Sequence, residues 1–123
     1  MRDIKADTAG CMTGFSREDG VLTAQFLFPE AFSGFQGHFP DRKVLPGVCQ
    51  ILCALAVVER GEGVPVSLTE VILAKYAAPV FPGETLTCTV QRAAGESGAA
   101  VYKARLEAQG KKVAELKLRV ETR

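Results

Sequence analysis

The segment from Pro46 to Arg60 constrains the fold most, because its apolar side chains cover nearly the whole circumference of a helix. With 3.6 residues per turn, the apolar side chains that spread over most faces are Val48, Ile51, Leu52, Leu55, Ala56 and Val58. A helix that is hydrophobic on all sides must be buried on most of them. Gly61 follows it and predicts a helix end with positive φ at that residue.

The rest of the chain predicts strands. Val21 to Phe28 alternates between two faces, and Val66 to Val80 is a long extended segment rich in β-branched and aromatic residues. Three further strands are predicted at Thr85 to Arg92, Ala99 to Gln109 and Lys111 to Thr122, separated by the turns Gly95-Glu96-Ser97-Gly98 and Gln109-Gly110. We therefore predict an α+β protein in which an antiparallel meander wraps around one long central helix, the hotdog architecture.

Length and composition predict one domain over residues 1–123. The chain has 47% hydrophobic residues, enough for one core, and Lys+Arg 15 against Asp+Glu 14 disfavours a nucleic-acid binder. The longest apolar run, Val44 to Val58, is too short to cross a bilayer, and the first residues lack the apolar core of a signal peptide. We expect a cytoplasmic protein that is not inserted in a membrane.

The four cysteines, Cys11, Cys49, Cys53 and Cys88, form no C-x-x-C pair. With one histidine in the chain, no zinc set is complete, so we expect no metal. Cys49 and Cys53 share one helix face and are interpreted as apolar packing, with a nucleophilic cysteine near the histidine as the alternative.

His38 is the one obvious acid/base residue of the chain, since an unperturbed imidazole titrates near pH 6.5. It lies in a proline-bounded loop that runs into the predicted helix at Pro46-Gly47. Free N–H groups at a helix start can hold a carbonyl oxygen that becomes negative. A base and an oxyanion donor are thus predicted on one short segment.

Two motifs carry a family resemblance. Phe35-x-Gly37-His38-Phe39-Pro40-x-x-x-Val44-Leu45-Pro46-Gly47-Val48 resembles the active-site signature of the FabA/FabZ-type 3-hydroxyacyl-acyl-carrier-protein dehydratases. Lys75-Tyr76-Ala77-Ala78-Pro79-Val80-Phe81-Pro82-Gly83-Glu84-x-Leu86 resembles the second signature of that family. Leu45-Pro46-Gly47-Val48-x-Gln50 is also similar to a divergent branch associated with aryl polyene and related specialised lipid pathways. The resemblance covers about residues 20 to 121.

The resemblance implies a mechanism. His38 would remove the proton α to a thioester carbonyl, and the N–H of Gly47 would stabilise the enolate oxygen. Phe39, Pro46 and Val48 would border the substrate, and Gln50 could hydrogen-bond substrate or water. We expect the other aromatic residues to divide between core and tunnel wall: Phe26, Phe28, Phe35, Tyr76 and Phe81. No cofactor is needed.

Leu52 departs from the pattern, because the family's Glu or Asp falls at this position and leucine donates no proton. Asp41 is a possible substitute acid, and Glu59 would require a different substrate placement. Alternatively, a partner chain supplies the carboxylate.

The predicted function is that of a 3-hydroxyacyl-thioester dehydratase-like lyase acting on acyl carrier protein or coenzyme A. The alternatives are a non-catalytic acyl-thioester-binding or partner subunit of a heteromeric dehydratase, and an acyl thioesterase. The exposed flank of a single sheet predicts a homodimer, with a higher oligomer or a heterodimer as alternatives.

Overall fold

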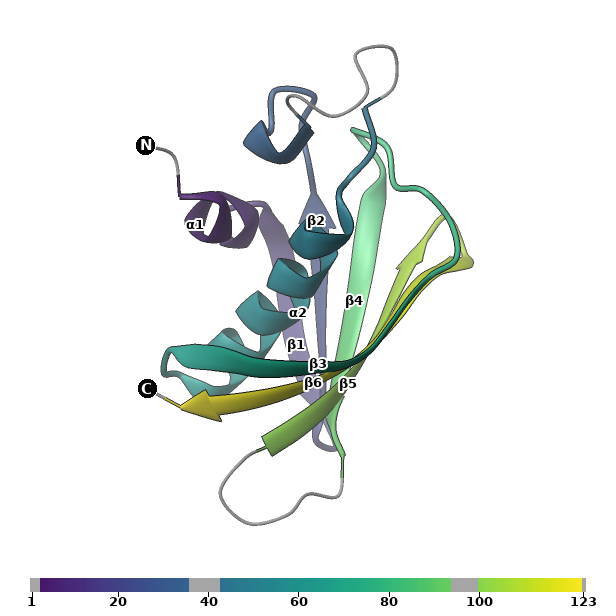
Figure 1. Ribbon diagram of the computed structural model, residues 1–123. Coiled ribbons are helices and arrows are strands. Elements are labelled where there is room, and N and C mark those ends of the chain that lie inside the picture. Colours follow the sequence, from purple (N-terminus) through teal and green to yellow (C-terminus); the bar gives the residue numbers. More distant parts are fainter. Residues whose placement is uncertain (1–2, 36–42, 94–99, 123) are drawn as a thin grey trace.

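The computed structural model describes residues 3–35, 43–93 and 100–122. Its helices and strands follow the chain in the order α1 (Ile4–Ala9), β1 (Met12–Glu18), β2 (Val21–Leu27), the short 3₁₀ helix η1 (Ser33–Phe35), α2 (Gly47–Glu62), β3 (Val66–Tyr76), β4 (Thr85–Arg92), β5 (Ala100–Ala108) and β6 (Lys111–Thr122). The six strands form one sheet in the order β1-β2-β4-β5-β6-β3, and every neighbouring pair is antiparallel. The sheet curves strongly around α2 (Figure 1). This confirms the predicted hotdog fold.

The core lies between α2 and the inner face of the sheet. Alternate residues of the strands are buried there, as the alternation of β2 predicted, and they include Leu22, Ala24, Phe26, Leu86, Cys88, Val90, Leu106, Leu116 and Leu118. The helix contributes Cys53, Val57 and Val58, which are at most 1% exposed. Burial of these side chains stabilises the helix, since each large aliphatic group contributes roughly 1.5–3 kcal/mol when fully removed from water.

The end of α2 differs from the sequence prediction. The helix continues through Gly61 and ends at Gly63, which has φ 75° and donates its N–H to the carbonyl of Glu59. Gly61 is instead a site of close packing, because a Cβ there would lie 2.5 Å from Cδ1 of Leu22. Its carbonyl accepts a hydrogen bond from the guanidinium of Arg17. Gly61, which the sequence predicted as the end of the helix, therefore lets β2 approach the helix.

The N-terminal part of the chain adds elements that the sequence did not predict. The short helix α1 is capped by Asp3, whose carboxylate accepts from the N–H groups of Lys5 and Ala6, and it packs against α2. Strand β1 follows and pairs with β2 at one edge of the sheet. The expectation of a single helix was therefore wrong, because six residues are too short to show a clear helical period.

The residues of the turn between β5 and β6 explain this hairpin. The predicted β5–β6 turn is confirmed, with Gln109 at φ 52° and Gly110 at φ 75°. Positive φ at both central residues matches the right-handed twist of the strands. The predicted Gly95–Gly98 turn lies outside the described residues.

Strand β3 forms the other edge of the sheet, and in the described part of the chain β6 is the one strand that pairs with it. Three of its apolar side chains, Leu68, Val71 and Ile72, are 37–42% exposed. An unpaired strand edge with exposed apolar side chains can pair with another chain. Within the described residues, no helix has the length and apolar character needed to span a membrane.

Candidate functional site

Among the residues that the structure describes, the first backbone N–H groups of α2 have no hydrogen-bond acceptor. Pro46 is extended, with φ −61° and ψ 151°, and no side chain caps the helix. The N–H groups of Cys49 and Gln50 donate to the carbonyl of Pro46. The N–H groups of Gly47 and Val48 come before them and have no acceptor within the described part of the helix. This end of the helix dipole carries partial positive charge and favours an oxygen that becomes negative.

A cleft of about 430 Å³ lies beside this helix end. It is lined by Val44, Leu45, Gly47, Gln50, Tyr76, Ala77, Ala78 and Pro79. A mostly apolar cleft with a few polar groups is typical of small-molecule sites. Of the residues predicted to stabilise the oxyanion or bind the substrate, Gly47 and Gln50 line this cleft. Pro46 and Val48 are outside its lining, and Val48 is 60% exposed.

The cleft is formed where the two sequence motifs meet. The N–H of Leu45 donates to the carbonyl of Val80 at 2.8 Å. Beyond it, the N–H of Phe81 donates to the carboxylate of Glu84 at 2.7 Å, and Gly83, with φ 83°, donates its N–H to Phe28. The Leu45–Val80 bond thus holds the turn after β3 against the segment that enters α2, while the other two bonds shape the turn and fix it to the end of β2.

Tyr76 closes one side of the cleft, and sequence reasoning did not foresee its specific contact. Its hydroxyl donates to the carbonyl of Gly47 at 3.1 Å. A Cβ at Gly47 would lie 2.6 Å from Cζ of that ring, so glycine is needed for this approach. Burial raises the pKa of Tyr76, which keeps the hydroxyl protonated as a donor. The position of Tyr76 inside the second motif is the one sequence signal that points to it.

Gln50 is buried, with 3% of its surface exposed. Its side-chain oxygen Oε1 is buried without a hydrogen-bond partner in the described part of the chain. An unpaired buried acceptor costs roughly 1–3 kcal/mol, so such atoms are rare in folded proteins.

Leu52 is half-buried and packs against the core. Glu59, the nearest acid further along α2, is occupied: its Oε2 accepts from Nζ of Lys5 at 3.1 Å and from the N–H of Val66 at 2.8 Å. Glu59 therefore holds α1 and β3 against α2. This role argues against Glu59 as a substitute for the missing acid.

The cysteines behave as packing residues. Burial raises the pKa of Cys49 to about 11 and that of Cys88 to about 12, and it raises the pKa of Cys53 as well. All four cysteines are free thiols. Because the thiolate is the nucleophilic form, these buried thiols are unreactive near neutral pH. Within residues 3–35, 43–93 and 100–122, no group of three His, Cys, Asp or Glu side chains could hold a metal ion.

His38, Phe39 and Asp41 lie outside the described residues. The described chain resumes at Lys43, whose ammonium contacts the carboxylate of Glu30 at 3.5 Å. The roles predicted for these three residues therefore remain predictions.

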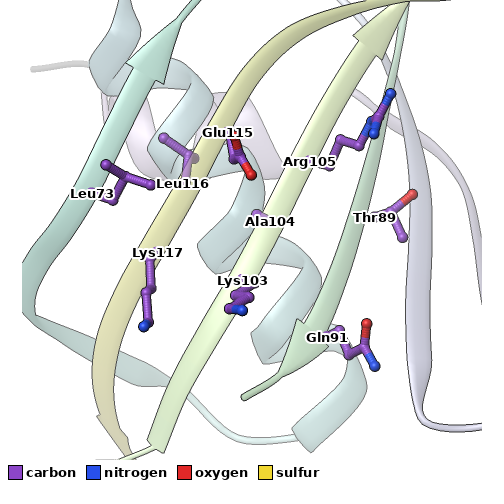
Figure 2. Close-up of a pocket in the computed structure, with 9 residues that line it drawn as sticks. All are labelled: Leu73, Thr89, Gln91, Lys103, Ala104, Arg105, Glu115, Leu116 and Lys117. Atoms are coloured by element: carbon purple, nitrogen blue, oxygen red, sulfur yellow. The ribbon is translucent and has the colours of Figure 1, made fainter.

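A second pocket, also of about 430 Å³, lies over strands β3 to β6. Figure 2 shows Lys103 and Lys117 on neighbouring strands, with Arg105, Thr89 and Gln91 further along the same surface. None of its lining residues lines the cleft at Gly47. We place the candidate site at the N-terminus of α2, because the cleft there is lined by Gly47 and Tyr76 from the two sequence motifs and by Gln50.

The antiparallel sheet curved around one long central helix, with an apolar cleft at the start of that helix, defines a hotdog-fold protein. A sequence model of the ApeI-like family, described as ApeI dehydratase, matches residues 15–117. The chain belongs to this family.

Curated relatives agree with this assignment. The chain is 30% identical over 96 residues to the 3-hydroxyacyl-acyl-carrier-protein dehydratase FabZ of Ehrlichia chaffeensis, an alignment that covers 74% of this chain and 66% of that enzyme. It is 33% identical over 89 residues to FabZ of Brucella melitensis, covering 66% of this chain and 57% of that enzyme. The chain thus spans less than two thirds of the length of these relatives.

Solved structures show the same fold. The dehydratase heterocomplex ApeI:P from Xenorhabdus doucetiae superposes with a TM-score of 0.73 at 19% identity, covering 89% of this chain and 95% of that chain. The PaaI protein of the phenylacetic acid degradation operon of E. coli gives 0.71 at 20% identity, covering 95% and 86%.

Proposed function

We propose that the protein acts on 3-hydroxyacyl thioesters carried by acyl carrier protein or coenzyme A, converting them to 2-enoyl thioesters and water. The observation that carries this proposal is the uncapped start of α2, where the Gly47 amide lies at the edge of an apolar cleft. Membership in a dehydratase family and the likeness to FabZ enzymes support the choice of reaction.

In the proposed reaction, His38 takes the proton from the carbon α to the thioester carbonyl. The electron pair of that C–H bond moves toward the carbonyl, and the Gly47 N–H stabilises the oxygen as it becomes negative. The pair then forms the C2–C3 double bond while the C3–O bond breaks, and the leaving hydroxyl takes a proton to become water. Phe39 and the apolar lining exclude bulk water.

The leaving hydroxyl needs a proton donor. This chain has none at the family's usual position, since Leu52 stands there. Asp41 is the substitute within the chain that we propose. It lies three residues after His38 in the sequence.

A second candidate function is a partner subunit in a heteromeric dehydratase, and Leu52 is the observation that favours it. A related chain would then bring a carboxylate to the acyl group bound here. The heterocomplex described for the ApeI:P structure is a precedent for such pairing within this fold.

We also propose that the chain forms a homodimer through β3. Leu68, Val71 and Ile72 lie on this edge strand and are 37–42% exposed. A second copy would satisfy the free backbone groups of the edge and cover these side chains.

The test is incubation of the purified protein with 3-hydroxyacyl and trans-2-enoyl thioesters on both carriers, followed by mass spectrometry. Interconversion that is lost in His38→Ala supports the dehydratase. Release of free thiol supports a thioesterase instead. Binding without turnover supports the partner subunit, and no binding at all contradicts the proposal.

A further inference from the structure

The oxygen Oε1 of Gln50 requires a hydrogen-bond donor that the described chain does not provide. The side chain is 3% exposed, and Oε1 has no partner within the described residues. Burying Oε1 without a hydrogen bond costs free energy of desolvation. An apolar side chain of similar size would fill the same space without this penalty, so packing alone does not explain a glutamine here. A donor that arrives with a ligand would satisfy the atom.

The surroundings of Gln50 narrow the choice of ligand. Gln50 and Tyr76 are the two polar side chains among the residues that line the cleft. The hydroxyl of Tyr76 already donates to the Gly47 carbonyl. The remaining lining side chains offer no donor to Oε1, since they are valine, leucine, alanine and proline.

We propose that Gln50 is the residue that selects the 3-hydroxyl group of the substrate, with Oε1 accepting a hydrogen bond from that hydroxyl. This inference rests on the proposed function. Within the acyl group, the 3-hydroxyl is the one hydrogen-bond donor, since the thioester carbonyl only accepts. The 2-enoyl product has lost this hydroxyl as water and has no donor to offer.

Helix geometry is consistent with one acyl group reaching both positions. Gly47 and Gln50 are three residues apart, which places them on one helix face with a rise of about 4.5 Å between them. In the substrate, the carbonyl carbon and the carbon that bears the hydroxyl are separated by a single carbon. A carbonyl oxygen at the Gly47 N–H thus leaves the hydroxyl within reach of the next turn of the helix.

Gln50 is a specificity residue in this proposal and transfers no proton. A carboxamide has no acidic proton of useful strength, so it orients the hydroxyl while another group protonates it. The substrate should bind more tightly than the product, because only the substrate satisfies Oε1.

The experiment compares the affinities of two unreactive ligands, the amide analogues of 3-hydroxyhexanoyl-pantetheine and hexanoyl-pantetheine, in which nitrogen replaces the thioester sulfur. Calorimetry on the wild-type protein should show about tenfold tighter binding of the hydroxylated ligand, equivalent to about 1.4 kcal/mol. Gln50→Leu should bring the ratio of the two affinities close to one. Gln91→Leu, the same chemical change at an exposed position of β4 outside the cleft, should keep the wild-type ratio.

The remaining outcomes overturn the inference in distinguishable ways. If Gln50→Leu weakens both ligands equally, Oε1 serves a donor that the two ligands share, either the amide N–H of the analogues or a group of the pantetheine arm. If wild type shows no preference, Oε1 binds water only, and the proposed function survives. If neither ligand binds wild type, the proposed function fails together with the inference. Gln50→Met gives the same test should Gln50→Leu not fold, as checked by its thermal unfolding.

Discussion

The hydroxyl of Tyr76 donates a 3.1 Å hydrogen bond to the carbonyl oxygen of Gly47, 29 residues away in the chain. This contact joins the end of β3 to the start of α2 and brings the two sequence motifs together at one cleft. It also explains why glycine stands at the first helical position, since the ring occupies the space of a Cβ.

Gly47→Ala is expected to destabilise the protein by about 1 kcal/mol, because the new Cβ lies 2.6 Å from Cζ of Tyr76 and forces the ring to move. Helix propensity alone would favour alanine over glycine by up to about 1 kcal/mol, so the two effects oppose each other. Urea unfolding measures the net change. In a Tyr76→Ala background the same substitution should be neutral or stabilising, and an equal loss in both backgrounds would rule out the clash.

Leu52→Glu is expected to create or raise dehydration activity by at least about tenfold, because it restores a proton donor at the family's position. The readout is the rate of enoyl thioester formation by mass spectrometry. Leu52→Gln is the matched control, being similar in size but unable to donate a proton as an acid, and it should show no gain. A Leu52→Glu protein that folds, binds substrate and remains inert would count against the lost-acid explanation.

Rising pH is expected to destabilise the protein above about pH 9. Burial raises the pKa of Cys49 to about 11 and of Cys88 to about 12 from the ordinary value of 9.0. The folded state therefore holds protons that the unfolded state releases, so this contribution is complete below pH 9 and is lost as the pH rises through 11 and 12. Cys88→Val, which does not titrate, should flatten the fall of the unfolding free energy between about pH 9 and pH 12. An unchanged slope would contradict this assignment.

Lys103 and Lys117 face each other directly on β5 and β6, and among the described residues neither has an ion-pair partner. Like charges at opposed positions are destabilising, so Lys103→Glu should stabilise the protein by about 0.5 kcal/mol at low salt and by less at high salt. Thermal unfolding at two salt concentrations measures this. Lys111→Glu, whose opposed residue is Ala108, serves as the control. The same gain in both variants would exclude the pairwise explanation.

Val71→Lys is expected to convert a dimer into a monomer, because a charge would lie on the β3 edge that we propose as the interface. Light scattering coupled to size-exclusion chromatography gives the mass directly. Leu27→Lys is a matched control, since Leu27 and Val71 are both 42% exposed and Leu27 lies on β2 inside the sheet. A Val71→Lys protein that stays dimeric would place the interface elsewhere.

The sequence predicted the central helix and most strands, because the spacing of their apolar residues follows which side chains are buried in the core. The bounds of β4 and β6 agree with the prediction, and the alternation of Val21 to Phe28 matches the buried and exposed faces of β2. Strand β3 ends at Tyr76, earlier than the predicted Val80. The β6 ladder ends at the pair Tyr76–Ala114, and the carbonyl of Val80 instead accepts a hydrogen bond from the N–H of Leu45.

Other features depend on tertiary contacts that a single sequence does not show. Gly61 and Gly63 are two residues apart, and only the folded chain shows that Gly63 caps the helix with φ 75° while Gly61 packs against Leu22. The candidate site was predicted in part: Gly47 and Gln50 line one cleft, whereas the contact of Tyr76 with Gly47 needed the folded chain. The unpaired oxygen of Gln50 is likewise visible only after its surroundings are known.

The central claim is that His38 removes an α-proton and that the start of α2 stabilises the resulting enolate oxygen. Solvent deuterium incorporation tests this claim most directly. Proton removal at C2 needs no acid at position 52, so the exchange should occur even if dehydration is slow. We predict that a saturated acyl thioester incubated with wild-type protein in deuterium oxide gains deuterium at C2 by mass spectrometry, and that His38→Ala abolishes this gain. Bound thioester without deuterium in the wild type, or equal exchange in both proteins, would contradict the account.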